Sequence, residues 1–307
     1  MSSLSNIANR TFNPEHLASV EMKTGVKAPL GKVLNMALEY VDLVHLGDSD
    51  HRSTELVETG AAQKGIDHLF LEIDDYNQPY LEHYYANPTY REKFVEHAEN
   101  WNNHVPEGFG ELITNAIDTA QGNEAEVHFV NPGNGVEEFF AWENAYEEMK
   151  SGFFASRQEK ESVSNALRAY KEARTVNDSQ VAQRIDKAMD TGEKAVLIYG
   201  DGHGVWDVKT DLNGAMETSN IKISMYSSRD SYKEALDTHA SILKDAPELK
   251  KYGMDRPELI YIKDENKVFF TEETPESLRK AIDEYTQTSD LNNFQGFTNK
   301  NGYNVIQ

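Results

Sequence analysis

Two apolar runs, far apart in the chain, each end in a glycine that is followed by an acid and then a histidine. The two segments are residues 41–51 (VDLVHLGDSDH) and 194–203 (KAVLIYGDGH). A short apolar run closed by a turn residue is typical of a buried strand. In an open α/β sheet, ligands bind beyond the carboxyl ends of the parallel strands. We therefore expect the two loops to contribute to a single site.

Five side chains follow or end predicted strands in a way that suggests chemistry. Asp48 and His51 follow the first run, Asp201 and His203 follow the second, and Glu72 lies near the end of another apolar segment. Histidine and carboxylate side chains transfer protons near neutral pH or bind a divalent cation. A carboxylate in an apolar run needs a partner, whereas Gly-Asp and Asp-Ser pairs are also ordinary turn chemistry. The residue types favour water activated by histidine or by a metal bound to histidine and carboxylate side chains.

Other side chains are expected to assist or to be structural. The residues expected to contact a substrate are Arg52, Glu55, Asp201 and Tyr76. The tyrosines around Tyr76 either line a pocket for a ring-shaped ligand or pack an insertion onto the sheet. His45 and His128 lie inside predicted strands and are expected at the core or on a sheet face. His68 lies at the far end of its strand from Glu72.

The order of apolar runs and helical stretches predicts an α/β fold with a mixed, mostly parallel sheet flanked by helices and a helical insertion after the second strand. The predicted parts are an N-terminal arm (1–30), one α/β domain (31–287) with its insertion at about 74–122, and a loose C-terminal tail (288–307). Strands are expected over 41–46, 66–73, 125–130, 194–199, 221–226, 259–263 and 268–270. The stretch 156–189 is expected to form two helices with a break near Asn177 and Asp178, where Asp178 or Ser179 would cap the second helix.

The composition of the chain limits the classes of molecule that it is expected to bind. The chain has 307 residues, a net charge of −22 and no cysteine. Such an acidic chain is a poor partner for nucleic acid or an anionic membrane, so a small molecule or peptide is expected instead. Without cysteine or a GxSxG turn, a thiol or serine nucleophile lacks support. A cytoplasmic location is the default expectation, export without a cleaved signal is an alternative, and the oligomeric state is open.

These residues resemble the erythromycin esterase/ChaN-like superfamily, which is related to the TraB/TIKI proteins. The segment 47–51 followed by Glu55 is similar to a G-E-x-x-H-x-x-x-E start with Asp48 in place of glutamate. Glu72 resembles the acid that those families carry after the next strand, and 200–203 resembles a later G-x-x-H. Asn177 stands where an arginine is expected at the start of an intervening helix.

The resemblance implies a site and several functions. His51 would be a general base or metal ligand, Glu72 and His203 would complete the site, and Asp48 would orient His51. The first hypothesis is hydrolysis of an ester or amide, with a divalent metal as one option. The alternatives are a protein that binds haem or another ligand, and a non-catalytic toxin or effector-type interaction domain.

Overall fold

An eight-stranded sheet forms the centre of the protein, which is described here by a computed structural model. The structure describes residues 25–48, 54–100, 108–133, 136–151, 156–200, 212–245 and 257–300. The strands are β1 (Val26–Lys27), β2 (Leu43–Asp48), β3 (His68–Asp74), β4 (Glu126–Asn131), β5 (Ala195–Gly200), β6 (Asn220–Tyr226), β7 (Leu259–Ile262) and β8 (Lys267–Phe270). Their order is β1-β8-β7-β6-β2-β5-β3-β4. The run from β7 to β4 is parallel, and β8 and β1 are antiparallel additions. The predicted mixed α/β fold is confirmed.

Strand residues alternate between two apolar layers. In β2, Val44 and Leu46 belong to one buried cluster and Leu43 belongs to the other. All six residues of β5 are buried, as expected for a strand covered on both faces. This explains why the sequence shows these strands as near-continuous apolar runs.

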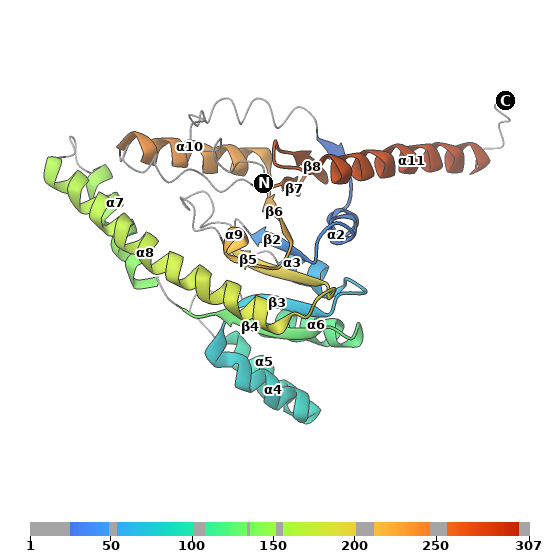
Figure 1. Cartoon of the computed structure of the whole chain (residues 1–307), viewed down its shortest axis with the longest axis horizontal. Helices are drawn as coiled ribbons and strands as arrows, with labels where there is room; N and C mark the ends of the chain where they lie inside the picture. The colour runs from blue at the N-terminus through green and yellow to red at the C-terminus, as the bar shows by residue number, and fades with distance from the viewer. Residues whose placement is uncertain are drawn as a thin grey trace.

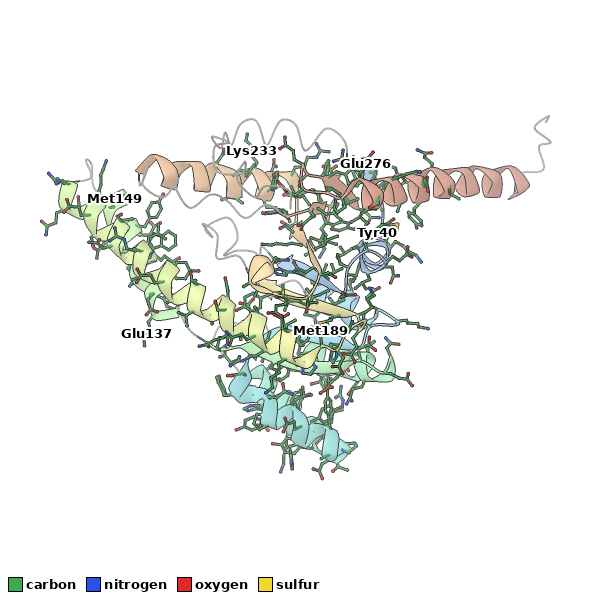
Figure 2. The ribbon with its side chains drawn as sticks, in the orientation of Figure 1. Tyr40, Glu137, Met149, Met189, Lys233 and Glu276 are labelled. Atoms are coloured by element: carbon green, nitrogen blue, oxygen red, sulfur yellow. The ribbon has the colours of Figure 1, made fainter. Side chains whose placement is uncertain are left out.

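Helices cover both faces of the sheet (Figure 1). On one face lie α2 (Leu30–Leu38), α3 (Thr54–Ala61), α6 (Phe109–Gly122) and α11 (Glu276–Lys300), and on the other lie α8 (Arg157–Ala188), α9 (Leu212–Ala215) and α10 (Arg229–Asp245). The helix α7 (Val136–Ser151) packs along α8. This α7–α8 pair runs from a distant tip near Met149 to Met189 beside the sheet (Figure 2). None of the described helices is long and apolar enough to cross a membrane.

The helix α8 differs from its prediction. It begins with a capping box between Ser156 and Glu159 and continues unbroken through Asn177 and Asp178, so the expected break is wrong. Both side chains are buried. Asn177 donates its amide to a residue of β5 instead of capping a helix, because tertiary packing overrides a local preference for caps.

The insertion after β3 is helical, as predicted. Its elements before α6 are two short 3-10 turns, η2 (Asp75–Asn77) and η3 (Pro88–Tyr90), with α4 (Gln78–Ala86) and α5 (Arg91–Glu99). The α4–α5 pair projects from the side of α6 that faces away from the sheet (Figure 1). At the other end of the chain, α11 continues to Lys300, so residues 288–300 are helical where a loose tail was expected.

Candidate functional site

The carboxyl ends of β2, β5 and β3 lie side by side and define the candidate site. Asp48, the last residue of β2, pairs with Gly200 on one side and Met225 on the other. Glu72 on β3 accepts a hydrogen bond from the backbone N–H of Gly200 through Oε2. The two glycine-acid-histidine segments therefore leave the sheet from neighbouring strand ends. Glu72 has the partner that a carboxylate at the end of an apolar strand requires.

A chain of polar side chains lies between α8 and this edge. Asn177 on α8 donates Nδ2 to the Tyr199 hydroxyl at 2.7 Å, and Tyr199 donates to Oδ1 of Asn131 at a longer 3.4 Å. Asn131 in turn donates Nδ2 to Oδ1 of Asp74 at 2.8 Å. Asn177 is 0% exposed and Tyr199 is 1% exposed. We call Asn177, Tyr199, Asn131 and Asp74 the polar chain.

Asp74 ends the polar chain at the surface and has a perturbed acidity. Burial raises the pKa of its carboxyl, and neighbouring Asp75 raises it further, whereas hydrogen bonds from Tyr76 and Asn131 oppose the rise. Perturbed carboxyls in such positions are frequent at functional sites. Asp74 is therefore the described acid of this edge whose protonation responds most clearly to its surroundings.

Arg184 places a cation beside the acids. It donates Nη1 to the carbonyl oxygen of Val130 at 2.7 Å and Nη2 to Oδ2 of Asp75 at 2.5 Å. These two bonds tie α8 to the end of β4 and to the start of the insertion. The edge thus offers carboxylates, amides, a phenol and one guanidinium to a polar ligand.

The predicted site residues fall into three groups. Glu72 lies at the edge as expected, and Tyr76, in the η2 turn that follows β3, has 61% of its surface exposed. Asp48 is the last residue of β2 and Glu55 is in the first turn of α3, but their side chains lie outside the described part of the structure. The remaining predicted residues, which are all outside the described residues, are His51, Arg52, Asp201 and His203. Their convergence stays a prediction.

Sequence reasoning missed other polar groups. Tyr199 and Asn131 are hidden inside strands that read as apolar or turn-forming. His45 is buried as expected, and its Nδ1 lies 2.8 Å from Oδ1 of Asn213. Within the described residues, the set of histidine and acidic side chains that approach closely enough to share a metal is His68, Glu126 and His128. That set lies at the amino edge of the sheet, opposite Glu72. In the sequence, residues 126 and 128 lie two apart on one predicted strand, so their side chains share a face; this spacing was the available sign of the cluster.

Comparisons with known proteins identify no family. No family model matches the sequence, and no curated protein matches it, so membership of the erythromycin esterase superfamily finds no support there. Among solved structures, the type III effector HopBA1 is 18% identical with a TM-score of 0.43, covering 66% of this chain and 87% of that chain. ChaN of Campylobacter jejuni, solved with cofacial haem, is 10% identical with a TM-score of 0.39, covering 63% of this chain and 85% of that chain.

Proposed function

We propose that this protein binds a small polar molecule at the carboxyl edge of β2, β5 and β3. The observation that supports the proposal is the polar chain, which runs from the centre of the layer under α8 to the surface at Asp74. Buried polar groups cost stability unless each one is hydrogen-bonded. An apolar layer at this position would pack without that requirement, so a role in recognition accounts for the polar residues.

The composition of the edge defines the ligand class. Glu72, Asp74 and Asp75 supply acceptors, and Arg184 supplies a donor. The exposed phenol of Tyr76, in the η2 turn that follows β3, adds aromatic surface. These groups favour a planar molecule that carries hydrogen-bonding substituents.

Haem is the first ligand to test, because an exposed tyrosine beside a carboxylate is a suitable iron ligand. Haemin is titrated into the protein and the Soret band is recorded. We expect a shifted Soret band with the wild type and its loss or displacement in Tyr76→Phe. The control is Tyr40→Phe, since Tyr40 is also exposed and lies next to α2, away from α8 (Figure 2). Equal spectra for all three proteins rule out Tyr76 as the iron ligand.

Hydrolysis of an ester or amide is the second candidate function. It is favoured by the pairing of Asp48 with Gly200, because the segments that carry His51 and His203 begin at those two positions. Wild type and His51→Ala are compared on p-nitrophenyl esters and on peptides. Turnover by the wild type and its loss in His51→Ala support hydrolysis, whereas equal rates exclude a role for His51. If neither haem binding nor turnover is observed, the interaction-domain alternative is favoured.

A further inference from the structure

Three potential metal ligands meet at the amino edge of the sheet, on a different edge from the proposed ligand site. His68 and Glu126 are the first residues of β3 and β4, and their Cα atoms are register partners. His128, two residues along β4, pairs with Phe70 in the same way. Its ring lies 5.1 Å from that of His68 and 4.9 Å from that of Phe70, measured between centroids. The three side chains therefore share one face of two adjacent strands.

The donor atoms are close enough to share an ion. His68 Nδ1 lies 3.0 Å from His128 Nε2, and Oε1 of Glu126 lies 4.0 Å from the same His128 nitrogen. All three donor atoms lie within 4.8 Å of one another. Two nitrogens that bind Zn²⁺ at about 2.0–2.1 Å in a tetrahedron are about 3.3 Å apart. The two imidazoles need to separate only slightly, and the Glu126 side chain needs to move closer.

A fourth side chain orients His68. Nε2 of His68 lies 2.9 Å from Oε2 of Glu193, and this same oxygen accepts the backbone N–H of Asp190 at 2.6 Å. Glu193 therefore accepts a hydrogen bond from the Nε2–H of His68. That tautomer leaves the lone pair on Nδ1, the atom directed at His128. Histidine ligands of metals commonly have such a carboxylate partner.

Exposure leaves room for solvent on one side of the cluster. The side chain of His68 is 8% exposed and that of His128 is 20% exposed, while that of Glu126 is 68% exposed. A buried histidine, a partly buried histidine and an exposed carboxylate give three protein ligands and one side open to water. Two imidazoles and one carboxylate suit first-row divalent metals better than Ca²⁺ or Mg²⁺, which prefer oxygen ligands.

We propose that His68, His128 and Glu126 bind one divalent transition-metal ion, and that Glu193 positions His68 for this role. The ion ties together the amino ends of β3 and β4. Through Glu193 it also links them to the turn that leads into β5. The site is independent of the ligand site at the carboxyl edge.

Zn²⁺ itself is the probe for this site. Calorimetric titration of the metal-stripped full chain with ZnCl₂ is expected to give one binding event at the amino edge. Because Glu126 is exposed, Glu126→Gln keeps the fold and is expected to weaken Zn²⁺ binding by at least about tenfold. Glu193→Gln is expected to weaken it by about 10–100-fold, as is usual for the carboxylate partner of a ligand histidine. Co²⁺ replaces Zn²⁺ in a second experiment, in which His128→Gln is expected to abolish the visible bands of the bound Co²⁺.

Two controls separate this site from other histidines. His83→Gln removes an exposed histidine on α4 and is expected to leave Zn²⁺ binding unchanged. His51→Ala tests the carboxyl edge and is also expected to retain the ion. The proposal is overturned if the wild type binds no Zn²⁺, or if Glu126→Gln and His128→Gln both bind it as tightly as the wild type. Loss of the ion in His51→Ala alone assigns it to the carboxyl edge and overturns the proposal.

Discussion

The hydrogen bond between Asn177 and Tyr199 gives the sharpest test of the polar chain. Its two heavy atoms are 2.7 Å apart and both side chains are almost completely buried. Tyr199→Phe removes only the hydroxyl, which accepts from the Asn177 amide and donates the longer bond to Asn131. Removing a buried hydrogen bond costs about 1–3 kcal/mol, so we expect that loss in the free energy of unfolding. Asn177→Leu, which keeps the branched shape of the side chain, is expected to cost about the same.

The double variant decides whether the pair acts as a unit. Replacing both partners with apolar groups of similar shape is close to neutral, so the double variant is expected to lose only about 0–1 kcal/mol. Urea unfolding at neutral pH, followed by circular dichroism, measures all four proteins. Equal slopes against urea concentration confirm that the comparison is valid. Losses that add to within about 0.5 kcal/mol refute the coupling.

The same double variant separates stability from recognition. If the polar chain serves ligand binding, the double variant stays folded and loses affinity for the ligand. Haemin is the first probe, with the wild type measured in parallel. Unchanged affinity in a stable double variant contradicts a recognition role for this part of the polar chain.

Three further predictions concern single positions. Gly110→Ala is expected to destabilise the protein by about 1–3 kcal/mol in urea unfolding, since the added methyl group overlaps the Val95 carbonyl oxygen of α5. An unchanged urea midpoint contradicts the close approach of Gly110 to α5. Glu124→Gly is expected to stabilise the protein by about 1 kcal/mol in the same assay. The reason is that Glu124 has a φ of 68°, a conformation that costs a non-glycine residue about that much. Asn123→Gly is the control and is expected to bring no such gain. The native pKa of Asp74 is raised, so the folded state binds its proton more tightly and wild-type stability falls as pH rises from the usual carboxyl pKa through the native one. Asp74→Asn removes this dependence, so its stability relative to wild type is expected to increase between acidic and neutral pH, and a pH-independent difference opposes this explanation.

The strands were predictable because their apolar runs are long and bounded by turn residues. The strand expected over 194–199 differs from β5 by one residue at each end. The two-residue β1 carries no such signal, because its pairing with β8 is a tertiary contact. The helix break near Asn177 and Asp178 was predicted because Asp178 or Ser179 would suit a helix cap. The buried position of that side chain against Tyr199 could not be read from one sequence.

The candidate site was predictable only where burying that type of residue at its position costs free energy. Glu72 stands out as an acid in an apolar strand, and the structure gives it a backbone partner. Tyr199 is hidden, because a tyrosine in a buried run looks like any other core residue. His68 was set aside because it lies at the amino end of its strand. Its pairing with His128 depends on the register of β3 against β4, which one sequence does not reveal.

The side chains of β3 point alternately to the two faces of the sheet, and this explains how one strand contributes to two separate sites. Leu69, Leu71 and Ile73 face the layer that contains α3 and α6, while Phe70 belongs to the layer under α8. By alternation His68 and Glu72 face the same way as Phe70. Four residues of strand separate their Cα atoms by about 13 Å, too far for the two side chains to bind one metal ion. An ion held by His68 and a ligand held near Glu72 are therefore independent, and removing either one is expected to leave binding of the other unchanged.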